Sequence, residues 1–312
     1  MTGNFYIDGQ DAYSLYQVFV TDNGYKDLVV FPSLKAIDSN DWAEEDGEEF
    51  DLSAPVLDTK ELSIGFAFHG HNARFGTFIE QLSDGAYHDF NFSDIEKTYR
   101  LRMISQPNMS QVSTLGVFSL RFADDFPLAD YNYVAPQSNI VPEQGYELDE
   151  SDLSEYGVYV LRGSETEILK SPAVKKNLLQ DIKTQSGAIY DGEYVFFQTK
   201  EVKLNCLMRA STLQEFWRNY NALLYDLSRP EERALFAHSN GYEYPCYYKS
   251  CSVSKFSPQG KIWFEFSLVF VFTSFRVGVG GGEEFLLAAE DGTLIITEDN
   301  EENAINLSIY GD

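Results

Sequence analysis

Two histidines separated by one glycine are the first residues whose types and spacing allow chemistry. His69-Gly70-His71 follows a run of alternating apolar residues, so both imidazoles would lie on one face at the end of a strand. Two imidazoles meet one requirement of a metal site, but a structural zinc site normally has four ligands and no cysteine lies nearby in the sequence. A metal-dependent hydrolase built on His69 and His71 is therefore a low-ranking alternative, and we expect a histidine pair at a strand end or in a loop.

Other signatures of catalysis are missing from the sequence. It contains no Gly-x-Ser-x-Gly elbow, no phosphate-binding Gly-x-x-x-x-Gly-Lys loop and no dinucleotide-binding fingerprint. Carboxylate pairs carry little information, because a chain with 49 aspartate and glutamate residues contains many by chance. His88 and His238 are isolated in the sequence, and we expect both at the surface. The sequence predicts no catalytic residues, no cofactor, no metal and no enzymatic activity.

A cluster of tyrosines offers binding chemistry instead: Tyr242, Tyr244, Tyr247 and Tyr248. Exposed tyrosines combine an apolar ring with a polar hydroxyl and can stack on sugars. A carbohydrate-binding β-sandwich is therefore an alternative function. Such a run is also typical of a strand with one face in the core and the other in an interface, and we favour this interpretation.

The chain repeats an ordered pattern of strand, helix and strand. TKEL at 59–62 and FSLRF at 118–122 return as TKEV at 199–202 and FSLVF at 266–270. The offset is 140 residues between Thr59 and Thr199 and 148 between Phe118 and Phe266. A fixed order at nearly constant spacing is the signature of a duplicated unit. Because duplication multiplies a packing surface more readily than a catalytic site, the repeat favours a role in assembly.

In the first copy, a strand and a helix are predicted in succession. Apolar residues alternate through residues 60–68, which predicts a strand with one apolar face. The next segment is predicted to be a helix that begins at Asn72 and ends at Asp84-Gly85, with four apolar residues at helical spacing: Phe75, Phe78, Ile79 and Leu82.

The second copy has the clearer helix. Ser211 and Gln214 form a predicted capping box, an apolar stripe follows, and Pro230 ends the pattern. The strand after each helix is expected to match, at residues 99–103 in one copy and 244–248 in the other. The predicted fold is β-rich α+β, with two similar split barrels or sandwiches that each carry one flanking helix.

The start of the chain is predicted to hold short strands and a long loop. Residues 5–9 and 15–20 are predicted strands, with Asn23-Gly24 as a hairpin turn because both residues accept a positive φ. The acidic segment 38–51 is predicted to be a loop.

These elements divide the chain of 312 residues into four segments. The first copy is predicted at 1–126, an acidic linker at 127–152 and the second copy at 153–276. A glycine-rich joint and a C-terminal β-hairpin are predicted at 277–312, where residues 285–289 and 293–297 flank a turn. An isolated hairpin is marginal in water, so we expect it to dock on its own domain or on a neighbouring subunit.

Charge and composition exclude several classes of protein. The net charge is −26, with acidic clusters at 38–51, at 143–155 and after Arg276, so the chain lacks the basic surface of a nucleic-acid binder and should not bind anionic membranes. The longest apolar run, at 262–272, is too short to span a bilayer, and residues 1–10 do not form a secretory signal. Three cysteines without framework spacing indicate buried thiols in a reducing compartment: Cys206, Cys246 and Cys251.

A series of short motifs runs in fixed order through the second copy: YGVYVLRGS at 156–164, AVKKN at 173–177, GAIYDG at 187–192, then the strand at Thr199, the helix and the strand at Phe266. This series resembles the distal tail proteins of long-tailed phages, whose N-terminal domain is similar to the tube domain of baseplate hub proteins. The resemblance covers about residues 153–275 well and about 5–126 more loosely.

The resemblance implies a split barrel with a flanking helix that assembles side by side into a ring around a channel. Such a ring joins the tail tube to the host-recognition apparatus of a phage or prophage, and the genome and tape-measure protein pass through it. Here the unit occurs twice, as in hub proteins, so three chains would supply six copies, or six chains if one copy alone lines the channel. The expected partners are copies of the chain and the tube, tape-measure and tip or receptor-binding proteins. The expected location is the virion tail, after synthesis in the host cytoplasm.

Overall fold

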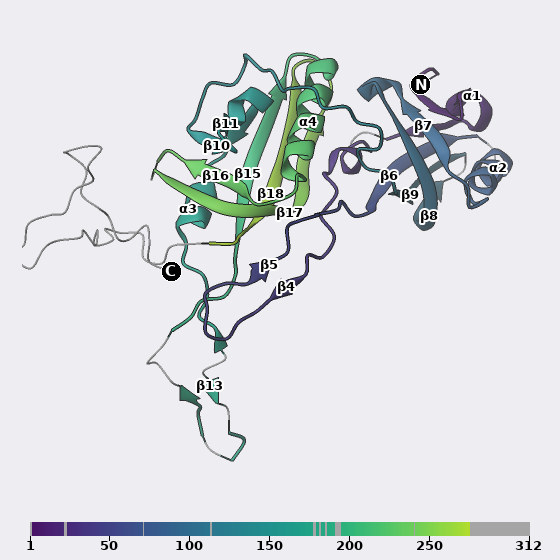
Figure 1. Ribbon diagram of the computed structural model, residues 1–312. Coiled ribbons are helices and arrows are strands. Elements are labelled where there is room, and N and C mark those ends of the chain that lie inside the picture. Colours follow the sequence, from purple (N-terminus) through teal and green to yellow (C-terminus); the bar gives the residue numbers. More distant parts are fainter. Residues whose placement is uncertain are drawn as a thin grey trace, which may run out of the picture. The chain divides into compact units, whose positions relative to one another are not determined.

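The computed structural model describes residues 2–21, 24–70, 72–112, 114–176, 179–180, 182–184, 186–190, 195–239 and 241–274. Two seven-stranded antiparallel sheets dominate these residues (Figure 1). One helix flanks each sheet, so the predicted β-rich α+β class is confirmed. The C-terminal hairpin and its glycine-rich joint lie outside the described residues.

The first sheet uses strands that precede and strands that follow the flanking helix Asn72–Leu82 in the sequence. Every pair is antiparallel. The strand order is β2 (Gln10–Asp11), β1 (Phe5–Ile7), β7 (His88–Phe92), β8 (Lys97–Val112), β9 (Leu115–Asp124), β6 (Lys60–His69) and β3 (Val18–Val20).

The second sheet has the same topology, strand for strand. Its order is β11 (Ser151–Asp152), β10 (Tyr146–Leu148), β16 (Arg233–Ala237), β17 (Tyr242–Ser257), β18 (Ile262–Phe272), β15 (Lys200–Ala210) and β12 (Val158–Val160). The repeat seen in the sequence is thus a repeat of topology. β10 and β11 fall within residues 127–152, where a linker was expected, and the domain boundaries stay a prediction.

The longest strand of each sheet bends at corresponding places. β8 has register shifts between Met103 and Ser105 and again before Asn108, and β17 has them between Tyr248 and Ser250 and between Val253 and Lys255. The part of each strand before the first shift pairs mainly with β7 or β16, and the part beyond it pairs with β9 or β18. Because bulges bend and twist a strand, each sheet curves around its own aromatic core.

The central strands β6 and β15 alternate between buried and less buried side chains, as the sequence predicted for β6. In the first sheet Phe66 lies opposite Phe118, and their ring centroids are 5.4 Å apart. In the second sheet Cys206 takes the place of Phe66, opposite Phe266. Both copies thus bury one face of the same pair of strands, with different side chains.

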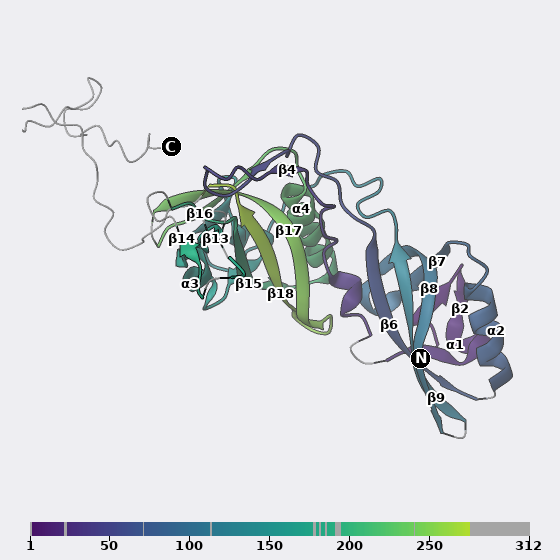
Figure 2. The same ribbon diagram turned by 90° about the horizontal axis from the view of Figure 1, so that it is seen from below.

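Helices α2 (Asn72–Leu82) and α4 (Leu213–Leu227) follow β6 and β15, and α4 lies along the second sheet (Figure 2). The predicted capping box at Ser211 and Gln214 is wrong by one residue. The N-cap is Thr212, whose Oγ1 accepts from the Glu215 backbone N–H at 3.1 Å, while Glu215 accepts from the Ser211 N–H at 2.8 Å. Ser211-x-x-Gln214 and Thr212-x-x-Glu215 both have the spacing of a capping box. The second pair is favoured because the charged carboxylate of Glu215 is a stronger acceptor for a backbone N–H than the Gln214 amide.

The strand predicted at residues 15–20 is also wrong in its first half. Asp11 caps a short helix, α1 (Ala12–Tyr16), by accepting from the Ser14 N–H at 2.6 Å, and Gln17 at φ 58° ends it. The strand that follows, β3, pairs with β6, and among the described residues it has no strand partner directly after Gly24, where the hairpin was predicted. Asn23 itself lies outside the described residues.

Each copy sends out a long arm before its central strand. We name residues 33–58 the first arm and residues 173–198 the second arm. Isolated bridges join the ends of each arm, Leu34 with Leu57 and Val174 with Phe197. Each arm carries a two-stranded hairpin: β4 (Ser39–Asn40) with β5 (Glu49–Phe50), and β13 (Leu179–Gln180) with β14 (Ile189–Tyr190). The segment predicted as a loop at 38–51 is therefore a hairpin, and every pairing recurs 140 positions later.

Short helices precede the arms. They are η1 (Asp27–Val29) in the first copy, and η3 (Leu153–Tyr156) and α3 (Ser164–Leu169) in the second; a further turn, η2 (Ser93–Ile95), lies between β7 and β8. None of the helices in the described part of the chain is long and apolar enough to cross a membrane.

Candidate assembly interface

The histidines with spacing for a metal site do not meet further ligands among the described residues. His69 is the exposed last residue of β6, and His71 lies outside the described residues. Within the described ranges, no group of three or more His, Cys, Asp or Glu side chains is arranged to hold a metal ion. The geometry gives the hydrolase alternative no support.

His88 is buried, which corrects the expectation that it lies at the surface. It is 7% exposed, with Nδ1 2.7 Å from Asp8 Oδ2 and Nε2 3.2 Å from Asp84 Oδ1. Burial lowers the pKa of the imidazole, but hydrogen bonds to both carboxylates and their charges outweigh it and raise the pKa above 6.5. No local pattern in the sequence predicts this burial, because Asp8 is 80 positions away. His238 is exposed as expected and contacts Glu147 at 2.6 Å.

The raised pKa of His88 predicts a pH-dependent stability. The folded chain holds the proton at a higher pH than the unfolded chain, so the stabilisation is complete below the unfolded pKa of 6.5 and is lost as the pH rises through the folded pKa. We expect the difference in unfolding free energy between the native chain and His88→Gln to shrink as the pH rises above 6.5. Urea unfolding between pH 5.5 and 8.5 measures it. A difference that stays constant over this range would contradict the ion pairs.

Packing buries the side chains of the tyrosine cluster fully or in part. Tyr244 and Tyr248 are buried, and Tyr242 and Tyr247 are half-buried. The Tyr248 hydroxyl donates to the Pro32 carbonyl at 3.0 Å. Two of the four rings are therefore inaccessible to a sugar, and β17 has the core-and-interface character that we favoured.

The three thiols are free, and Cys206 and Cys246 are fully buried while Cys251 is partly buried. Burial raises the pKa of all three thiols, that of Cys251 to about 12. These thiols are therefore protonated and unreactive at neutral pH.

One buried lysine lies at the same place in each copy. Lys60 Nζ donates to the Leu28 carbonyl at 2.6 Å, and Lys200 Nζ donates to the Ile168 carbonyl. Burial lowers the pKa of each ammonium group to about 8. In both copies the lysine ties the first residue of the central strand to the helical turn before the arm.

Phe31 joins the two copies through apolar contacts. It precedes the first arm, is 1% exposed and packs among aromatic rings of the second copy. Its ring centroid lies 4.4 Å from that of Tyr220, 5.7 Å from Phe266 and 6.3 Å from Phe264. A residue of the first copy thus completes the core of the second.

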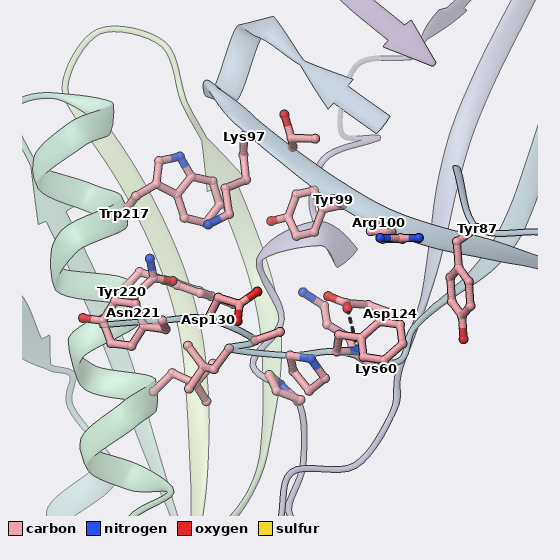
Figure 3. Close-up of a pocket in the computed structure, with 18 residues that line it drawn as sticks. Lys60, Tyr87, Lys97, Tyr99, Arg100, Asp124, Asp130, Trp217, Tyr220 and Asn221 are labelled. Atoms are coloured by element: carbon pink, nitrogen blue, oxygen red, sulfur yellow. Dashed lines mark hydrogen bonds between the residues drawn. The ribbon is translucent and has the colours of Figure 1, made fainter. Parts of the chain in front are cut away.

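Helix α4 supplies polar contacts to the first copy. Trp217 Nε1 donates to the Ile95 carbonyl at 2.6 Å, and the Tyr220 hydroxyl donates to the Val30 carbonyl at 3.3 Å. The Lys97 ammonium lies over the Trp217 ring, 5.0 Å from its centroid, as Figure 3 shows. These bonds satisfy backbone carbonyls that the contact removes from water.

A cavity of about 620 Å³ lies beside these contacts, with residues of both copies in its wall (Figure 3). Its charged residues are Lys60, Lys97, Arg100, Asp124 and Asp130. Burial lowers the pKa of Lys97 and raises that of Asp124. Each of these shifts disfavours the charged form. Because residues of both copies share its wall, the cavity is a gap in their interface.

The first arm lies on the second copy, where Lys175 holds its hairpin. Lys175 Nζ donates to Asp41 Oδ1 at 2.5 Å, to the Trp42 carbonyl at 2.7 Å and to the Gly47 carbonyl at 2.8 Å. Three acceptors match the three N–H groups of an ammonium, and the lysine side chain is 7% exposed. No predicted site included this contact. Its signal in the sequence is the recurrence of Lys35, Asp41 and Gly47 as Lys175, Asp181 and Gly187.

Further contacts run along the first arm. Phe50 packs on Tyr247 with ring centroids 5.0 Å apart. Four hydrogen bonds with backbone N–H donors join the arm to the second copy. Three are accepted by backbone carbonyls, Leu34 N–H to Lys249 O at 3.1 Å, Gly47 N–H to Phe197 O at 2.9 Å and Glu231 N–H to Leu52 O at 2.8 Å, and one by a carboxylate, Phe197 N–H to Asp46 Oδ1 at 2.7 Å. Most of these bonds use the main chain, so they depend on the path of the arm more than on its side chains.

These contacts define a protein with two equivalent β-sheet copies, in which the arm of one copy clasps the other. The structure matches the crystal structure of the SPP1 Dit protein (gp 19.1), described as a paradigm of the hub adsorption apparatus in phages that infect Gram-positive bacteria, with 14% identity, a TM-score of 0.32, 86% of this chain and 97% of that chain covered. At this identity and TM-score, the likeness carries no functional argument. No protein-family model matches the chain, and no curated protein matches it.

Proposed function

We propose that the chain is a structural protein of a phage or prophage tail, of the distal-tail or baseplate-hub type. Its two copies stand side by side in a ring that connects the tail tube to the host-recognition tip. The proposed partners are other copies of the chain and the tube, tape-measure and tip proteins. The proposed location is the virion tail, after synthesis in the host cytoplasm, and the protein has no catalytic role.

The contact between two copies of one fold within one chain is the observation that carries this proposal. The surface that the first copy uses differs from the surface that the second copy uses, because the first gives its arm and the second receives it. Such a heterologous contact leaves both kinds of surface available for the next chain, and repetition at a suitable rotation closes a ring. Three chains then supply six copies.

The acidic composition agrees with a channel that DNA passes without being held. A net charge of −26 repels phosphates. We propose the domain boundaries as predicted, at 1–126 and 153–276, with the linker and the C-terminal extension as further segments.

The mass of the full chain in solution tests the ring. Light scattering after size exclusion, over a range of concentrations and with tail-tube protein present as a template, is expected to reach three times 35.5 kDa. A mass of one chain at every concentration, with the template included, would contradict the proposal.

A further inference from the structure

We call a lysine that binds the hairpin of an arm, as Lys175 does, a lysine clasp. The first copy has the corresponding lysine, Lys35. Lys35 and Lys175 are 140 positions apart, and each lies next to the bridge at the base of its arm. The Lys35 N–H donates to the Val56 carbonyl at 2.9 Å, as the Lys175 N–H donates to the Phe196 carbonyl at 2.7 Å. The two lysines therefore have the same backbone setting.

The two clasps differ in occupancy. Lys175 is buried under the first arm, whereas Lys35 is exposed, and its ammonium has no hydrogen bond or ion pair to any residue that the structure describes. The surroundings of Lys35 form a shallow polar depression at the base of the first arm, with Asp51 and Ser53 in its wall. A receiving site is thus present without its arm.

The second arm has the features of the missing occupant. Its Gly187 has φ +84°, as Gly47 has +69° in the first arm, and residues other than glycine rarely adopt this conformation. It also leaves five large apolar side chains exposed: Val174, Leu179, Ile182, Ile189 and Val195. Apolar residues gathered on one extension mark a surface that another protein covers.

We propose that the second arm of one chain docks on the first copy of a neighbouring chain, where the Lys35 ammonium holds the turn that carries the carbonyls of Ile182 and Gly187. This inference rests on the proposed function and assigns the contact between chains. The partner is a second copy of this chain, because the only arm shown to fit such a lysine is the chain's own first arm, which shares the register of the second.

The contact between chains should be weaker than the contact within one chain. The counterpart of Phe31, which fills the second core, is Ser171, and the counterpart of Glu48, whose Oε1 accepts from Thr199 at 3.0 Å, is Ala188. Fewer apolar and charged side chains would then contact the neighbouring chain. Assembly should accordingly be reversible and depend on concentration.

Charge reversal at Lys35 is the first test of this contact. Lys35→Glu should raise the concentration at which the full chain half-assembles by at least about tenfold, since a charged donor to buried carbonyls is lost. Lys203→Glu, an equal charge change at an exposed position of β15, is the matched control and should assemble like the native chain. Assembly of Lys35→Glu at the native concentration would overturn the inference and leave the proposed ring intact.

Mixing of two defective chains tests the direction of the contact. One chain carries Lys35→Glu, and the other has residues 179–190 replaced by a short Gly-Ser linker. At the concentration at which the native chain half-assembles, neither should assemble alone. The mixture should give particles of two chains that do not grow, because a single intact arm meets a single intact lysine. Assembly by either variant alone at that concentration, or no association in the mixture, would overturn the inference.

A photo-crosslinking amino acid at position 36, beside an intact Lys35, gives a readout that does not need a stable ring. It should link two chains, with the linked peptide in the second arm. The same group at position 176, beside an intact Lys175, is the positive control and should link to the first arm within one chain. If position 176 links and position 36 gives no product between chains, the clasp is overturned. A native chain that also stays at the mass of one chain would then contradict the proposed ring as well.

Discussion

Phe31→Ala is expected to lower the free energy of unfolding by about 3–5 kcal/mol, the range for truncating a large buried aromatic residue. Phe31 is 1% exposed, and its ring lies among Tyr220, Phe264 and Phe266. The truncation would leave a cavity in the core of the second copy. It would also loosen the first arm, which begins two residues later, so amide hydrogen exchange in residues 33–58 should become faster.

Phe126→Ala is the matched control for this prediction. Phe126 is 52% exposed, and its truncation should change the unfolding free energy by no more than about 0.5 kcal/mol. Urea unfolding of both variants, followed by circular dichroism, gives the comparison. Equal midpoints for the two variants would show that Phe31 does not tie the copies together.

Lys60→Met is expected to remove a pH dependence worth up to about 3 kcal/mol. Burial lowers the pKa of Lys60 from 10.5 to about 8 in the folded chain. Between these values the unfolded chain binds a proton that the folded chain does not, so the unfolding free energy of the native chain rises with pH. Methionine cannot titrate, and the Tyr99 hydroxyl still donates to the Leu28 carbonyl at 2.8 Å, so the variant should fold.

Urea unfolding at pH 7 and pH 9.5 measures this effect as the difference between the native chain and the variant, which cancels groups common to both. The native chain should gain stability relative to Lys60→Met as the pH rises. Lys200→Met should behave in the same way, because the pKa of Lys200 is also lowered to about 8. Parallel pH profiles for the native chain and Lys60→Met would show that the ammonium is not desolvated.

The sequence predicted the parts of the fold that depend on short-range pattern. Alternation of apolar residues predicted β6, and the repeat of the Thr59 motif at Thr199 predicted β15 and the duplication. These signals succeed because a strand with one buried face must alternate. The short helix α1 was missed, because a single capping contact from Asp11 decided a five-residue segment.

Short-range patterns of this kind could not predict the interface between the two copies. The burial of His88 depends on Asp8, which is close only once the sheet has formed. The sequence predicts a loop for the acidic segment at 38–51, yet Asp41 and Asp46 bind groups of the second copy. Charge composition predicts that acidic segments are solvated on average. It cannot predict an ion pair with one lysine, Lys175, that lies more than a hundred positions away in the sequence. The spacing of Lys35, Asp41 and Gly47 against their counterparts was the available clue.

Electron cryomicroscopy of particles assembled from the full chain tests the central claim most directly, that two copies of one shape exist to stand beside one another. Averaged images should show a closed ring with a channel and six similar lobes, which alternate between the first and the second copy, in a particle of three chains. A particle with no channel, an open filament, or a ring in which the two copies occupy unlike positions would contradict the account.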